Sequence, residues 1–230
     1  MLAFWATDDN GTYGTLNGPT GWSQIASGST ASPDGQQYQL WTKVADGTEG
    51  ASQNWTFSTG PHSFGAIIGA WSNRLGAPAA GSVTTTAWNT TANASPVSLS
   101  LSGCTASASD DLAAFSFLDA TAANTWSFST IAGYTPQTTV TGTGTGSFCD
   151  CNLQTADNVS AGATGTLSLT ATASGGSAGW GGILVQISYG GVIVTKTMDD
   201  AILLADDISR YDWYTQFVTS GLIGRISRAN

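Results

Sequence analysis

The hydrophobic pattern of the chain is that of many short β-strands. Apolar residues alternate with small polar ones over residues 97–102 (VSLSLS) and 165–174 (GTLSLTATAS), which is the period of a strand with one buried face. Residues 64–71, 112–118 and 180–188 are nearly continuous apolar runs, which predicts central strands buried on both faces.

Gly, Pro, Asn and Asp clusters punctuate the remaining runs. The other predicted strands are residues 2–6, 21–27, 38–45, 53–58, 83–88 and 125–129, with a flexible Gly-rich segment at 138–147 that could form an edge strand. About ten to twelve short strands with a turn signal every eight to twelve residues are typical of an all-β protein. The sequence therefore predicts an antiparallel β-sandwich, jelly-roll or Ig-like, over residues 1–190.

Tryptophan is unusually frequent, with nine in the chain. Trp41, Trp55 and Trp71 lie in three consecutive apolar runs between residues 21 and 73, where strands of one sheet would place them in a core. Most of the nine are expected to pack inside the protein. The pattern does not indicate burial for Trp5, Trp88 and Trp213, and exposed tryptophan can stack on a sugar ring.

The pattern changes at Tyr189-Gly190-Gly191, and residues 191–230 are predicted to be a C-terminal docking or helical extension. Residues 191–196 form one more strand or an exit segment. Thr197 is a suitable N-cap, and apolar residues then recur at helical spacing as far as Val218, before Gly221. Such a helix needs a cover for its apolar face, either its own sandwich or a neighbouring subunit, and the second is favoured. The candidate docking residues are Leu204, Ile208, Tyr211, Trp213, Phe217, Leu222, Ile223 and Ile226.

Charge limits the classes of partner. Only 9% of residues are charged, against about a quarter in typical soluble proteins, and the net charge is −9. Residues 75–195 contain no Lys or Arg, so neither nucleic acid nor an anionic membrane surface is expected as a partner. The N-terminal segment does not resemble a signal peptide, and no apolar run reaches eighteen residues. A neutral, hydroxyl-rich composition favours an extracellular or particle-borne protein.

No motif predicts catalysis or a cofactor. Residues 175–179 (GGSAG) carry the letters of a nucleophile elbow around Ser177, but without the strand–turn–helix context that this motif requires. The single histidine, His62, follows a Gly-Pro turn, and a structural use is favoured for it. The four Asp pairs, which begin at Asp8, Asp110, Asp199 and Asp206, are predicted to be turn residues, caps or a solvated face.

The three cysteines allow more than one interpretation. Buried thiols, or one disulfide from Cys104 to either Cys149 or Cys151, are both favoured over a metal site, since familiar ligand spacings are missing. No metal-ligating residue is therefore assigned.

The runs GWSQIASGS, LWTKVADGTEG, WTFS, FGAIIGAWS and SVTTTAW, with the later AGATGTLSLTATA and WGGILVQIS, carry a resemblance. They resemble a β-sandwich module of phage virion proteins and bacterial surface proteins, over residues 1–188. In similar modules a further strand precedes the one that looks like LAFWA, so the resemblance implies a first sheet edge that is open or completed by a partner.

That resemblance implies a non-enzymatic virion protein, either a capsid decoration protein or a subunit of a head or tail fibre or appendage. It would self-associate as a homo-oligomer or bind the major capsid or tail protein of its particle. The alternative is a carbohydrate- or receptor-binding module that uses exposed aromatic residues on a host-surface glycan. A hydrolase is the weakest hypothesis.

Overall fold

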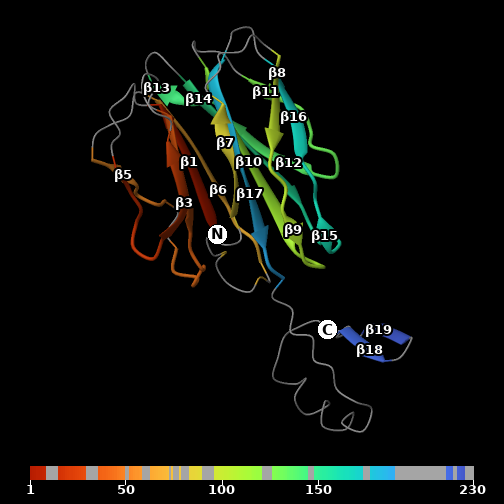
Figure 1. Cartoon of the computed structure of the whole chain (residues 1–230). Helices are drawn as coiled ribbons and strands as arrows, with labels where there is room; N and C mark the ends of the chain where they lie inside the picture. Colours follow the sequence, from red (N-terminus) through yellow and green to blue (C-terminus); the bar gives the residue numbers. More distant parts are fainter. Residues whose placement is uncertain are drawn as a thin grey trace. The chain divides into compact units, whose positions relative to one another are not determined.

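The computed structural model describes residues 1–8, 15–29, 36–49, 52–58, 63–72, 74, 78, 83–89, 96–120, 126–144, 148–172 and 177–189, with the backbone of 216–219 and 222–225. The chain divides into two compact units, Met1–Gly190 and Gly191–Asn230. Every regular element in these residues is a β-strand, and the strands pair antiparallel, which confirms the all-β class (Figure 1).

The first sheet has five strands. In order they are β13 (Thr143–Gly144), β6 (Ser63–Gly69), β1 (Leu2–Asp8), β4 (Gln36–Thr42) and β3 (Ser23–Ser29). β1 pairs along its whole length with β4 on one side and β6 on the other, so that Phe4 lies opposite both Leu40 and Ile67. The expectation of an open edge at the LAFWA strand is therefore wrong, because this strand is the centre of its sheet.

A second five-stranded sheet is here called the middle sheet. Its order is β12 (Thr135–Val140), β14 (Phe148–Ala156), β10 (Asp111–Ala120), β17 (Ser177–Ile187) and β7 (Val83–Asn89). The third sheet contains β11 (Ser127–Phe128), β16 (Leu167–Thr172) and β8 (Val97–Leu101). Two short pairs are also described in this unit, β15 (Gly162–Ala163) with β9 (Thr105–Ala106) and β2 (Leu16–Asn17) with β5 (Thr56–Phe57).

The middle sheet is covered on both faces. Phe115 of β10 packs in one cluster with first-sheet residues, and its ring stacks on that of Phe4 at 5.0 Å between centroids. Leu112 and Ala114 point the other way, into a second cluster with Leu99 and other residues of the third sheet. Figure 1 accordingly shows β10 and β17 between β1 on one side and β8 and β16 on the other. Burial on both faces explains the continuous apolar runs of β10 and β17, as predicted.

The strand β6 differs from its prediction. Ser63 and Ile67 are buried, but Phe64 is 37% exposed and Ile68 is 49% exposed on the opposite face. Only two residues of β6 have a β13 partner, so the strand lies almost at the sheet edge and has one buried face. Gly65 faces the middle sheet, where a Cβ would come within 2.4 Å of the Cys149 carbonyl oxygen, so the two sheets approach closely there.

The outer face of the first sheet carries a separate aromatic cluster. Trp5 is 9% exposed and contacts Trp55 at 5.4 Å between ring centroids, with Phe57 and Trp22 packed nearby. Trp126 and Trp180 are buried on the third-sheet side of the middle sheet. The prediction that most tryptophans pack inside the protein is confirmed for the described ones. The side chains of Trp88 and Trp213 lie outside the described residues.

The second unit has two described strands, β18 (Gln216–Thr219) and β19 (Leu222–Arg225), paired antiparallel with Val218 opposite Ile223. The predicted helix is therefore wrong where it extends through Phe217 and Val218. β-branched and aromatic residues favour strands, and the Ser-Gly dipeptide that separates the two runs in the sequence is a turn signal. The remainder of the predicted helix lies outside the described residues.

Candidate functional site

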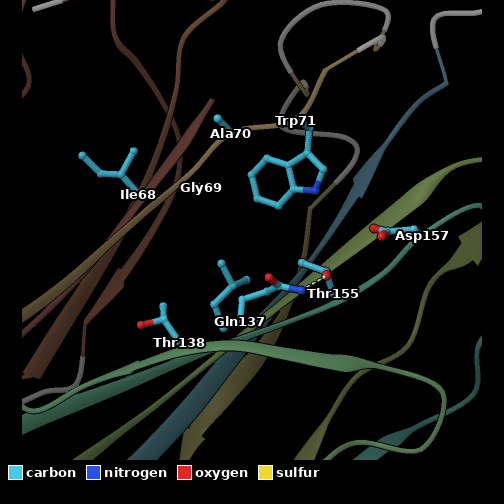
Figure 2. Close-up of a pocket in the computed structure, with 9 residues that line it drawn as sticks. Ile68, Gly69, Ala70, Trp71, Gln137, Thr138, Thr155 and Asp157 are labelled. Atoms are coloured by element: carbon cyan, nitrogen blue, oxygen red, sulfur yellow. Dashed lines mark hydrogen bonds between the residues drawn. The ribbon is translucent and has the colours of Figure 1, made fainter. Parts of the chain in front are cut away.

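A groove opens where the end of β6 meets β12 and β14, and its volume is about 410 Å³. Its walls come from both the first and the middle sheet. The described residues that line it are Ile68, Gly69, Ala70, Trp71, Gln137, Thr138, Leu153, Thr155 and Asp157. Figure 2 shows the Trp71 indole across the groove from the Gln137–Thr155 pair, with Ile68 and Asp157 at opposite ends.

Trp71 follows the end of β6 and its side chain is half-buried. The indole lies over Gly69, where a Cβ would come within 2.6 Å of Trp71 Cη2 and 3.5 Å of Leu153 Cδ2. Any larger residue at Gly69 would displace the ring. Gly69 and Leu153 therefore hold an aromatic ring at the groove wall, partly packed and partly open to solvent.

Gln137 lines the groove at a bulge in β12. The β12–β14 register passes from Pro136 to Thr138, so Gln137 is the extra residue. Its amide Nε2 donates to Thr155 Oγ1 at 2.8 Å. Bulges re-aim side chains and are frequent beside functional sites. With the bulge, two consecutive residues, Gln137 and Thr138, both line the groove.

Buried amides on β14 support this wall. Asn152 is 3% exposed, and its Nδ2 donates to the Thr138 carbonyl oxygen at 3.2 Å and to Thr139 Oγ1 at 3.0 Å. Gln154 Nε2 donates to Asn152 Oδ1 at 3.0 Å, and Gln154 Oε1 accepts from the Ile131 N–H at 2.8 Å. Because both ends of each amide are used, the segment that carries the bulge is fixed to the sheet.

Asp150 continues this buried polar row. It is fully buried, and its carboxylate accepts hydrogen bonds from the backbone N–H groups of Trp126 at 3.1 Å and Gly142 at 2.9 Å. Burial raises the pKa of Asp150 above its ordinary value, against the smaller lowering effect of these two bonds. The carboxylate joins the two ends of the segment that contains β12.

A second polar cluster lies where the first unit ends, at Tyr189. Asp110 is 2% exposed and accepts hydrogen bonds from the Ser107 N–H at 2.9 Å, from Gln186 Nε2 at 2.5 Å and from the Tyr189 N–H at 3.2 Å. Asp111, equally buried, forms an ion pair with Arg74 and accepts from the Asn158 N–H at 3.0 Å.

Arg74 completes this cluster. Its Nη1 donates to the Ser109 carbonyl oxygen at 3.3 Å, and its guanidinium lies 5.6 Å from the centroid of the Tyr189 ring. Arg74 and Tyr189 also form a β-bridge. We call Arg74, Asp110, Asp111 and Tyr189, with the residues that hydrogen-bond to them, the exit network. Asp110 is a turn residue, as predicted, but Asp110 and Asp111 are buried and paired rather than solvated.

The cysteines form no disulfide. Cys149 and Cys151 are buried in the core between the first and middle sheets, whereas Cys104 packs against the cluster on the other face of the middle sheet. The middle sheet therefore separates Cys104 from Cys149 and Cys151, the two partners that the sequence offers it for a disulfide. Burial raises the pKa of the Cys104 thiol, and the nearby Asp110 charge adds to this shift.

The residues predicted for docking are not brought into one described site. Phe217 lies in β18 and Leu222 and Ile223 lie in β19, as backbone positions of one hairpin. The others, which lie outside the described residues, are Leu204, Ile208, Tyr211, Trp213 and Ile226.

The candidates for catalysis are likewise not assembled. Ser177 is the first residue of β17, opposite Ala120, and not in a strand–turn–helix elbow, while His62 lies outside the described residues. Within the described ranges, no group of three or more His, Cys, Asp or Glu side chains is placed to hold a metal ion.

Sequence reasoning missed the groove. The apolar run 64–71 predicts that Trp71 belongs to a strand buried on both faces, and Pro136 beside Gln137 is compatible with an edge strand as well as with a bulge. The available signal was Gly69, two residues before Trp71. Glycine weakens a strand, so the strand can end there and leave the tryptophan outside it.

No protein-family model, curated protein or solved structure significantly matches the chain. Among the described residues there is no helix with the length and hydropathy needed to cross a membrane.

Proposed function

We propose that this chain is a non-enzymatic structural subunit of a phage virion, in which a β-sandwich carries a C-terminal docking extension. In this proposal the first and middle sheets are the two layers of the sandwich, and the third sheet covers its back. The subunit decorates the capsid or belongs to a head or tail appendage, and it binds the major capsid or tail protein or further copies of itself.

The observation that carries the proposal is the division of the chain immediately after the exit network. Asp110 and Arg74 hold Tyr189, and the second compact unit begins at Gly191. A buried network that joins Arg74, residues 107–111, Asn158 and residues 186–189 gives the extension a fixed point of departure. A separate unit that follows these held residues suits a subunit that docks on a lattice through its C-terminal extension.

Charge and composition support the same role. The chain carries −9 net charge with 9% charged residues, so its surface offers small hydroxyl side chains more than ions. Four of the six basic residues, Lys196, Arg210, Arg225 and Arg228, belong to residues 191–230. The same residues contain five aspartates, so the extension has a net charge of −1, against −8 for residues 1–190. An almost neutral extension meets less repulsion from an acidic partner surface, including that of another copy, than the first unit would.

Deleting residues 197–230 tests the docking role. We expect the truncated protein to keep its β-rich circular dichroism and melting temperature, because the described core lies within residues 1–189. It should no longer join its particle or oligomer, as followed by co-sedimentation with particles and by light scattering. A full-length Val44→Ala variant, altered at a 58% exposed side chain of the first unit, is the control.

Two outcomes would contradict the docking role. Normal assembly of the truncated protein would show that the extension is dispensable. A large fall in melting temperature on truncation would show that the extension instead stabilises its own first unit.

A further inference from the structure

We propose that the groove beside Trp71 is a binding site for an uncharged sugar ring. This site belongs to the first unit and does not depend on the docking role of residues 191–230. Its residues come from β6, β12, β14 and the segments that follow them.

The aromatic part of the proposed site is the Trp71 indole, which its neighbours hold in place but bury only in part. Trp71 is half-buried against Gly69 and Leu153, and Ile68, at one end of the groove, is 49% exposed. A pyranose has an apolar face of C–H groups and a rim of hydroxyls, so it stacks on such a ring while its rim reaches polar groups. By contrast, Trp5 and Trp22 are buried in the outer aromatic cluster, where both pack against Trp55.

The polar component lies across the groove. Gln137 uses its Nε2 on Thr155, and its Oε1 accepts no hydrogen bond from the described part of the chain. The Thr138 hydroxyl and the Asp157 carboxylate are on exposed residues at the same groove. An amide oxygen, a hydroxyl and a carboxylate are three hydrogen-bond acceptors for the hydroxyl rim of a sugar.

Charge decides which sugars fit. Asp157 is the single charged side chain among the described lining residues, and the protein carries −9 overall. A sialylated, uronic or sulfated sugar would place a second anion beside Asp157 without a lining cation to compensate. A neutral sugar instead donates a hydroxyl to Asp157, and such charge-assisted bonds are the stronger kind. The lining therefore selects uncharged sugars.

Size and rigidity agree with a small ligand. The groove volume of about 410 Å³ lies in the lower part of the range of about 300–1,000 Å³ found for small-molecule sites. Asn152 fixes the wall at Thr138, and the bulge at Gln137 is part of the sheet, so little ordering is needed on binding. A ligand of this size is expected to bind with a dissociation constant on the order of millimolar.

The test uses the full chain on a glycan array that carries neutral, sialylated and sulfated glycans, with saturation-transfer NMR on the soluble form of each glycan that binds. We expect binding to a subset of the neutral glycans, both displayed and free. Trp71→Ala should weaken that binding by about tenfold or more, and Trp71→Phe should restore part of it. Asp157→Asn should weaken it by about threefold to tenfold, and the control Val44→Ala should leave it unchanged.

Several results would overturn the assignment. They are failure of the wild type to bind any neutral glycan, equal binding of sialylated or sulfated glycans, and unchanged binding in both Trp71→Ala and Asp157→Asn. If Trp71→Ala alters circular dichroism and does not fold, Asp157→Asn carries the test, because Asp157 is exposed. Loss of particle assembly in Trp71→Ala with glycan binding intact would make the groove a protein interface and would also refute the sugar site.

Discussion

Replacing Phe115 by alanine is expected to lower the free energy of unfolding by about 3–5 kcal/mol, the range for large-to-small changes at fully buried aromatic residues. Phe115 is 0% exposed and stacks on Phe4 across the interface between the middle and first sheets. Alanine would leave a cavity between two sheets packed face to face, and the surrounding structure relaxes only partially around such a cavity. Urea unfolding followed by circular dichroism measures the change.

Phe64→Ala is the matched control for this substitution. Phe64 is 37% exposed on the outer face of the first sheet, where it contacts Trp5 and Phe57. Its truncation should cost about 1–2 kcal/mol, since less apolar area leaves water on folding. Equal losses for Phe115→Ala and Phe64→Ala would contradict the stacking of the first sheet on the middle one.

Replacing Asp150 by alanine is expected to cost about 2–4 kcal/mol, because a charged acceptor is removed and two backbone donors lose their partner. These donors, the N–H groups of Trp126 and Gly142, lie at the two ends of the segment that contains β12. The loss should appear locally as well. In native-state hydrogen exchange, the Trp126 and Gly142 amides should lose protection before those of β10, while unchanged protection of both would refute this role.

The ionisation of Asp150 also gives stability a pH dependence of definite sign. Because the folded-state pKa is raised above 3.8, the native state holds its proton more tightly than the unfolded chain does. This contribution to stability is present below pH 3.8 and is lost as pH rises through the folded-state pKa. Asp150→Asn cannot ionise, so the stability difference between it and the wild type should shift in favour of the variant across that window. A constant difference would contradict the raised pKa.

Strand positions were largely predictable from the sequence, because alternation in β8 and β16 and the apolar run of β10 report burial directly. β14 was not predicted as a strand. Its sequence, FCDCNLQTA, places Asp150, Asn152 and Gln154 at alternate positions, and polar residues at that spacing normally indicate a solvated face. Here they are buried and hydrogen-bonded, a condition that depends on distant residues such as Trp126 and Ile131.

The candidate site was less predictable than the fold. The bulge at Gln137 is a property of pairing between β12 and β14, and the exposure of Trp71 follows from where β6 ends in the first sheet. Neither the bulge nor the exposure of Trp71 can be deduced from the pattern of neighbouring residues in the sequence. The docking prediction rested on helical spacing after Thr197, and the strand β18 shows that this spacing does not hold at Val218. A period of three to four within a short apolar run does not exclude a hairpin when a turn signal interrupts it.

The central claim is that this protein is a structural component of a virion. Gold-labelled antibody against it, imaged by electron microscopy on purified particles, tests that claim most directly. We expect label at regular positions on the head or the tail of intact particles, and its absence from particles whose protein lacks residues 197–230. Particles free of label, with the protein recovered only in the unsedimented fraction, would contradict the claim.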